Sequence, residues 1–241
     1  MATTADLSQR RLPSRFWLAF VRSRVVRRLF VRLMKVAFGL HIRNEGLVSP
    51  PGPYIFASNH ASHYDLFLAM ASFCEITGEL PVPVVWRGVF DLPVIGSILR
   101  ALEAVSVSHD RGDEAERAAA VQEMIGLVRA GHCLVMACEG KRLDALGDFE
   151  LGAAFTSLNS GVPVVPVSLR GSQGLFSEMS WPQRFRGKVE IVLHPPLDPA
   201  DFDVDGSCST ETLNRFTQTI RDHVASCIDY PVEEAGAKAQ F

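Results

Sequence analysis

The chain has 241 residues, of which 47% are hydrophobic and 21% are charged, and its formal net charge is −3. This composition excludes an intrinsically disordered chain and allows a sizeable buried core in one large domain or two small ones. The five cysteines form no CxxC pair, so no disulfide framework or zinc motif is predicted and a reducing compartment is favoured.

Positive charge is concentrated at the start of the chain. Residues 1–44 hold ten Lys or Arg and one acid, a charge of +9, whereas the remainder carries −12. A basic arm on an acidic body indicates an anionic partner, either a membrane or a nucleic acid. We find no signal peptide and no uncharged apolar run of about 18 residues, so no transmembrane helix is expected.

Residues 24–40 have the pattern of a basic amphipathic helix. On a helical wheel, one half carries the cations Arg24, Arg27, Arg28, Arg32 and Lys35. The other half carries Val25, Val26, Leu29, Phe30, Leu33, Met34, Val36, Ala37 and Leu40, and Val31 is the exception. Phe16, Trp17 and Phe20 add bulky apolar anchors before it. Such a helix suits a membrane interface; the alternative is a helix packed on the body with a solvated basic face. So many cations on one face exceed what solubility requires, which favours the membrane.

Beyond the arm, short apolar runs alternate with helical segments. Strands are predicted at 54–58, 82–86, 104–108, 133–138, 162–168 and 188–193, and helices at 66–74, 113–130 and 209–228. Apolar strands separated by helices indicate an α/β fold with a mostly parallel sheet covered by helices. We therefore expect an amphipathic arm at 1–44, a single domain at 45–230 and a flexible tail at 231–241.

The stretch "SNHASHYDLFLAM" (58–70) places two histidines and an aspartate before an apolar helix. In one continuous helix His60 and Asp65 would lie about 140° apart, so His60 must lie in the loop and Asp65 in the helix. From there the carboxylate can orient the imidazole, which is the arrangement of a general base with its orienting acid. The alternative is a polar loop that caps a buried helix.

A second polar cluster, "CEGKR" (138–142), follows the predicted strand 133–138. A turn with Glu139 and Gly140, followed by Lys141 and Arg142, can form an anion site. Ligands of open α/β sheets bind at the carboxyl ends of the strands. The two clusters would therefore share one edge of the sheet, unless they are two unrelated turns.

Four segments resemble the motifs of the glycerolipid acyltransferases, the family that includes 1-acylglycerol-3-phosphate acyltransferase. "NHASHYD" resembles the NHxSxxD box and "CEGKR" the PEGTR box, while "WRGVFDLPVIGSILRAL" (86–102) and "GVPVVPVSLRGS" (161–172) resemble two further blocks. They occur in the family's order. Cys138 and Lys141 replace the Pro and Thr of PEGTR, and Ser108 and His109 stand where the second block usually ends in Asp-Arg.

The resemblance implies transfer of a fatty acyl chain to a hydroxyl without metal or cofactor. His60 would be the general base, and Asp65 would hold its tautomer. Arg142, with Glu139 and Gly140 shaping the turn, would hold the acceptor's anionic head, with Arg87 as a second candidate. Asn59 and Ser62 would fix the loop around His60, and one of them could donate to the oxyanion. His63 is interpreted as a bystander.

The resemblance also implies partners and a location. The donor would be acyl-CoA or acyl-carrier protein, and the acceptor a lysolipid, foremost 1-acylglycerol-3-phosphate, giving phosphatidic acid. The enzyme would lie peripherally on the cytoplasmic face of an anionic membrane and bind no nucleic acid. Two alternatives stay open: an acyltransferase for another acceptor such as a lyso-aminolipid, and a non-catalytic membrane-binding protein.

Overall fold

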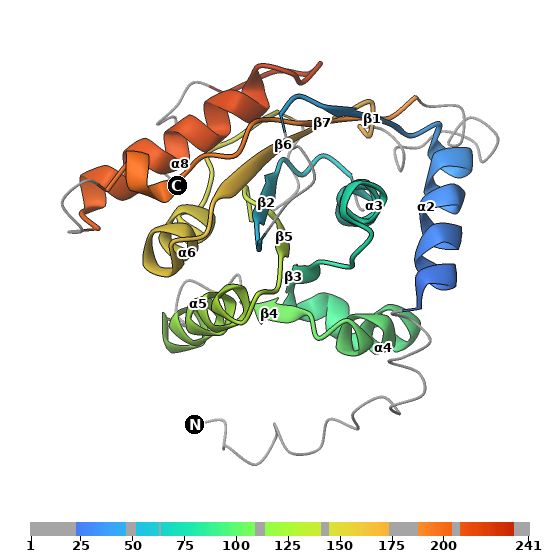
Figure 1. Cartoon of the computed structure of the whole chain (residues 1–241), viewed down its shortest axis with the longest axis horizontal. Coiled ribbons are helices and arrows are strands. Elements are labelled where there is room, and N and C mark those ends of the chain that lie inside the picture. Colours follow the sequence, from blue (N-terminus) through green and yellow to red (C-terminus); the bar gives the residue numbers. More distant parts are fainter. Residues whose placement is uncertain are drawn as a thin grey trace, which may run out of the picture.

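The computed structural model describes residues 23–46, 52–62, 64–108, 114–140, 145–173, 188–203 and 208–233. These residues fold around one seven-stranded sheet with the order β1-β7-β6-β2-β5-β3-β4 (Figure 1). The strands are β1 (His41–Asn44), β2 (Ile55–Ser58), β3 (Val82–Trp86), β4 (Val105–Val107), β5 (Leu134–Ala137), β6 (Val164–Arg170) and β7 (Glu190–Leu193). All neighbouring pairs are parallel except β6 and β7.

Helices cover both faces of this sheet (Figure 1). One face packs against α5 (Glu114–Arg129), α6 (Gly152–Ser160) and α8 (Thr210–Ala225). The other packs against α2 (Arg24–Phe38), α3 (Asp65–Thr77) and α4 (Pro93–Ala101). Two 3₁₀ turns, η2 (Arg87–Asp91) and η3 (Pro199–Asp201), complete the described elements. In the described part of the chain, no helix is both long and apolar enough to span a bilayer.

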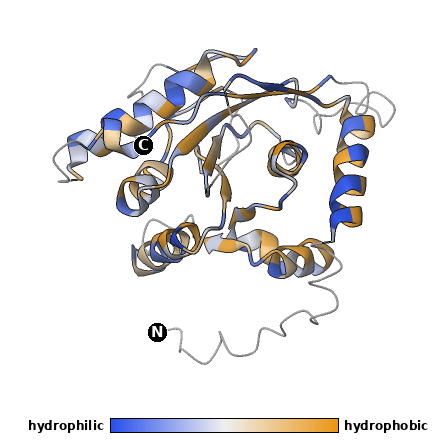
Figure 2. Cartoon of the chain, viewed as in Figure 1, coloured by the Kyte–Doolittle hydropathy of each residue, from blue (hydrophilic) through white to orange (hydrophobic). Residues whose placement is uncertain are grey.

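Alternate residues of the central strands enter two separate cores. Ile55 and Leu134 belong to the core under α5, α6 and α8, while Phe56 and Val135 belong to the core under α2 and α3. All four side chains are fully buried, and Figure 2 shows the central strands in hydrophobic colours. A strand buried on both faces reads as a continuous apolar run, which is why these strands could be recognised in the sequence.

The predicted fold class is confirmed: the sheet is mostly parallel, is covered by helices and is preceded by the amphipathic helix α2. All six predicted strands are present, as are the helices predicted at 66–74, 113–130 and 209–228. Strand β1 was not predicted. The division into arm, domain and tail stays a prediction, and Phe16, Trp17 and Phe20 lie outside the described residues.

Helix α2 is delimited by its two caps. The Ser23 side chain accepts a hydrogen bond from the Val26 N–H at the start, and Gly39 closes the helix in the left-handed conformation (φ 57°). Glycine adopts this conformation without the steric cost that a Cβ imposes. The chain then turns directly into β1, which pairs with β7. Helix α2 is thereby tied to the edge of the sheet.

Gly96 in α4 lies against the backbone of η2, and this contact yields a stability prediction. A Cβ built on Gly96 would lie 2.0 Å from the Phe90 carbonyl oxygen. We expect Gly96→Ala to lower the free energy of unfolding by about 1–3 kcal/mol, because backbone must shift to admit the methyl group. Urea denaturation measures this free energy.

The matched control is Gly126→Ala in α5. Nothing lies within 4 Å of a Cβ built there, so the free energy of unfolding should rise by about 0.5–1 kcal/mol. A loss at Gly126 as large as that at Gly96 would contradict this account.

Candidate active site

His60 and Asp65 meet at the carboxyl end of β2. His60 lies in the loop after β2, and Asp65 is the first residue of α3, as the spacing predicted. His60 Nδ1 is 3.5 Å from Asp65 Oδ2, with the carboxylate fully buried and the His60 side chain 25% exposed. Nδ1 therefore faces the protein, and Nε2 is the nitrogen left for a substrate. This separation is longer than a hydrogen bond, and such contacts in a substrate-free site often tighten when substrate binds.

Asp65 also fixes the backbone of the loop. Its Oδ2 accepts hydrogen bonds of 2.6 Å from the N–H groups of both Ala61 and Ser62. The Ser62 hydroxyl accepts from the N–H of Tyr64, the residue before α3. A carboxylate in the first turn of a helix is also favoured by the helix dipole. Asp65 therefore sets the loop geometry and places a carboxylate beside His60, and its role in orienting the imidazole stays a prediction.

Glu139 lies beside His60 because β5 is the neighbour of β2. Its side chain is buried, and it accepts hydrogen bonds from the N–H of His60 at 2.5 Å and of Gly147 at 3.0 Å. Burial raises the pKa of Glu139, although both hydrogen bonds oppose this shift. Gly140 follows in the left-handed conformation (φ 68°), which glycine adopts readily. The described contacts make Glu139 a support of the His60 loop, and its role toward the acceptor stays a prediction.

Asn59 joins the loop to β6. Its Nδ2 donates to the Leu169 carbonyl oxygen at 2.9 Å, and its Oδ1 accepts from the Leu169 N–H at 2.8 Å. The side chain thus pairs with the backbone of β6 as a neighbouring strand would. The same Nδ2 donates to the Tyr230 hydroxyl at 2.7 Å. Asn59 is fully buried, and its amide is occupied by these partners. This supports the predicted role in fixing the loop; Ser62 is buried as well, and donation to the oxyanion by either residue stays a prediction.

Tyr230 was not predicted as part of the site. It lies beyond α8, 171 positions from Asn59 in the sequence, and no motif marks it. Burial raises the pKa of its hydroxyl, so this group stays protonated at neutral pH. Together with Leu169, Tyr230 therefore holds Asn59, the residue that precedes His60.

Of the cations predicted to bind the anionic head group, only Arg87 lies within the described residues. Arg87 follows β3 at the same edge of the sheet, but its guanidinium is exposed and is paired with Glu116 at 3.1 Å. Arg142, Lys141 and His63 lie outside the described residues. The described site therefore contains the predicted base His60, the predicted acid Asp65 and the residues that support them, and the catalytic and head-group roles all stay predictions.

The comparisons with known proteins agree with the motifs. A family model described as "Acyltransferase" matches residues 39–170. Chloroplastic 1-acyl-sn-glycerol-3-phosphate acyltransferases of Brassica napus and Arabidopsis thaliana are 28% and 26% identical over 155 and 162 residues. These segments cover 64% and 66% of this chain, and 43% and 44% of the two relatives, so the chain spans less than half the length of each.

A solved structure has the same fold. The 1-acyl-sn-glycerophosphate acyltransferase PlsC of Thermotoga maritima superposes with a TM-score of 0.63 at 21% identity. The superposition covers 88% of this chain and 85% of that chain. At this identity the likeness shows a shared architecture.

Proposed function

Because the chain belongs to the acyltransferase family, we propose that it transfers a fatty acyl chain from a thioester donor, acyl-CoA or acyl-carrier protein, to the free hydroxyl of a lysolipid. The observation that carries this proposal is the buried Asp65 carboxylate 3.5 Å from Nδ1 of the partly exposed His60. That arrangement supplies a base at the protein surface and requires no protein nucleophile.

In the proposed mechanism, His60 Nε2 accepts the proton of the acceptor hydroxyl as its oxygen attacks the thioester carbonyl carbon. Asp65 stabilises the imidazolium that forms. The tetrahedral intermediate then breaks its C–S bond, and the imidazolium returns its proton to the leaving thiolate. General-base catalysis of this kind typically contributes about 10²–10⁴-fold. The supports from Glu139 and Asn59 keep the base in one position, which limits the entropy lost on reaching the transition state.

We propose 1-acylglycerol-3-phosphate as the acceptor and phosphatidic acid as the product. The names of the relatives support this choice. The test is a panel of lysolipids, including a lyso-aminolipid, offered with each donor and read by mass spectrometry. We expect thiol release that depends on 1-acylglycerol-3-phosphate. Preference for the lyso-aminolipid would identify the other acceptor class, thiol release without acceptor would indicate a thioesterase, and no release would favour a non-catalytic binder.

Arg142 is the proposed contact for the acceptor phosphate. We expect Arg142→Ala to lower kcat/KM for 1-acylglycerol-3-phosphate by about 10- to 150-fold, because a charge-assisted hydrogen bond is worth about 1.5–3 kcal/mol. The matched variant Arg87→Ala should have less effect, since Glu116 already occupies that guanidinium. Steady-state kinetics with an anionic and an uncharged acceptor measure both. An equal loss with the two acceptors would show that Arg142 has a structural role.

Helix α2 supports a peripheral position on an anionic membrane. Its inner face, formed by Phe30, Val31, Met34, Ala37 and Phe38, packs on the core. Its outer face carries an exposed apolar row of Val25, Leu29, Leu33 and Val36, in which Val25 and Val36 are 76% and 78% exposed. The apolar half of the predicted wheel is therefore divided between core and surface. The helix is packed on the body, as the alternative reading expected, and its outward apolar residues support the membrane reading, which stays a proposal.

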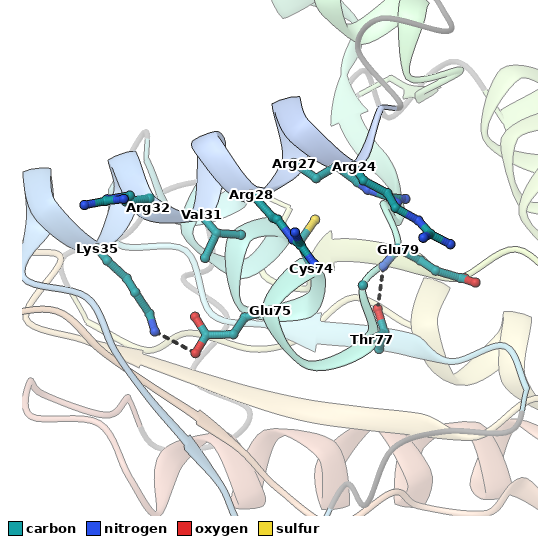
Figure 3. A pocket seen from close by; sticks show the side chains of 11 residues that line it. Arg24, Arg27, Arg28, Val31, Arg32, Lys35, Cys74, Glu75, Thr77 and Glu79 are labelled. Carbon is teal, nitrogen blue, oxygen red and sulfur yellow. Dashed lines mark hydrogen bonds and ion pairs between the residues drawn. The ribbon is translucent and has the colours of Figure 1, made fainter.

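A basic row runs beside the apolar row. Arg24, Arg28 and Arg32 are exposed and have no acidic partner among the described residues, whereas Lys35 pairs with Glu75 of α3 at 2.6 Å. These cations line a cleft of about 690 Å³ between α2 and α3 (Figure 3). A surface with both apolar residues and cations matches the acyl and head-group layers of an anionic bilayer. We propose the cytoplasmic leaflet, whose anionic lipids attract such a surface.

A further inference from the structure

Glu45, His194 and Cys227 form a cluster apart from the acyl-transfer site. They follow β1, β7 and α8 respectively, and one ligand atom of each lies within 4.8 Å of the others. His194 is 2% exposed, while Glu45 and Cys227 lie nearer the surface. The fold brings together an imidazole, a thiol and a carboxylate that no sequence motif links.

The hydrogen bonds of His194 leave one nitrogen without a proton. The Ser168 hydroxyl donates to the Val224 carbonyl oxygen at 2.9 Å, so its oxygen must accept from His194 Nε2, 2.7 Å away. A neutral His194 then has its lone pair on Nδ1, which lies 3.6 Å from Glu45 Oε2. Two acceptors that face each other repel unless a cation lies between them.

We propose that Glu45, His194 and Cys227 bind a zinc ion through a carboxylate oxygen, Nδ1 and Sγ. Two nitrogen or oxygen ligands of one tetrahedral zinc lie about 3.3–3.5 Å apart, and the 3.6 Å between Glu45 and His194 is already close to this. The thiol proton passes to solvent on binding, and water fills the fourth position. Cys227 Sγ lies within 4.8 Å of the other two ligand atoms, and the side chains of Glu45 and Cys227, which lie nearer the surface than His194, would move to close the remaining distance.

Arg43 lies at the rim of this cluster, where it contacts two of the proposed ligands and would not bind the metal itself. Its Nη2 donates to Cys227 Sγ at 3.5 Å, and its Nε is 3.1 Å from Glu45 Oε1. A guanidinium can hydrogen-bond a metal-bound thiolate and carboxylate without displacing the metal, and such outer contacts orient the ligands.

A metal here would hold the segment after α8 against β1 and β7. Three residues beyond Cys227, the Tyr230 hydroxyl contacts Asn59, which precedes His60. The ion would therefore stabilise a structural support of the acyl-transfer site without touching substrate. This inference does not depend on the proposed acceptor or reaction, because it concerns metal binding by the folded chain.

The test uses the full chain without a histidine tag and titrates it with Co²⁺, a zinc substitute whose bond to a thiolate absorbs in the near ultraviolet. We expect one Co²⁺ per chain with this band, displacement by Zn²⁺, and a Tm that rises with Zn²⁺ concentration. Cys227→Ser should abolish the band, while the matched control Cys208→Ser should keep it. Glu45→Gln, a surface change, should keep the band and weaken affinity at least tenfold.

Three results would overturn the proposal. They are the absence of a band in the folded wild type, a band that persists in Cys227→Ser, and a Zn²⁺-dependent rise in Tm that is the same in wild type and Cys227→Ser. Because metal is read by absorption and by Tm, a failure here is distinguishable from a failure of acyl transfer in the lysolipid assay.

Discussion

His60→Ala is expected to reduce acyl transfer by about 10²–10⁴-fold while the protein stays folded, because it removes the general base. His60 is partly exposed, so its truncation leaves no large buried cavity. Thiol release from the acyl donor in the presence of acceptor measures the rate, and circular dichroism checks the fold. The control is His132→Ala: this exposed residue precedes β5 at the opposite edge of the sheet, and the rate should not change.

Asp65→Asn is expected to lose less activity than His60→Ala. The Asn oxygen can still accept from the N–H groups of Ala61 and Ser62, as Asp65 Oδ2 does, so the loop is kept. Because Oδ2 is also the atom 3.5 Å from His60 Nδ1, the Asn oxygen still faces the imidazole but carries no charge to stabilise the imidazolium. Asp65→Asn thus removes the carboxylate charge and keeps the loop, whereas His60→Ala removes the proposed base itself. If His60→Ala kept more than about a tenth of the wild-type rate, its contribution would be under about 1.4 kcal/mol and the mechanism would be wrong.

The fold could be predicted where burial leaves a pattern in the sequence. Strands β2, β5 and β6 are buried on both faces, and such strands are continuous apolar runs. Strand β1, "HIRN", lies at the edge of the sheet with exposed ends, so it has neither an apolar run nor a clear alternation. The strand order and the antiparallel pairing of β7 depend on contacts distant in sequence, which local patterns do not contain.

The candidate site shows the same limit. The positions of His60 and Asp65 could be predicted because both lie in one short segment whose helical geometry constrains them. Tyr230 contacts Asn59 from the far end of the chain, and the Glu139 contact with the His60 N–H arises from the pairing of β5 with β2. The helical wheel of α2 could identify its apolar half. It could not tell which apolar residues pack on the core, because that depends on how the helix is rotated against α3.

Reversal of Arg24, Arg28 and Arg32 to Glu is expected to abolish flotation of the enzyme with anionic liposomes. Each Lys or Arg near such a surface contributes about 1 kcal/mol. Three reversals change six charge units, about 6 kcal/mol at low salt, or about 10⁴-fold in partitioning. The three side chains are exposed and unpaired among the described residues, so the fold should tolerate the change. Turnover of a short-chain soluble acceptor should stay close to wild type, since His60 and Asp65 are unchanged.

The matched control replaces the same three arginines by Lys, which keeps the charge and should keep flotation.

A second variant, Val25→Ser with Val36→Ser, tests the apolar row. It should weaken binding to neutral and anionic vesicles alike. Salt should not alter that loss, because salt screens charge but not apolar burial. Wild-type binding that ignores lipid charge would show that the basic row is only a solvated surface. If the Glu variant lost the fold together with flotation, the three arginines would be needed for folding, and the loss of flotation would not support membrane contact.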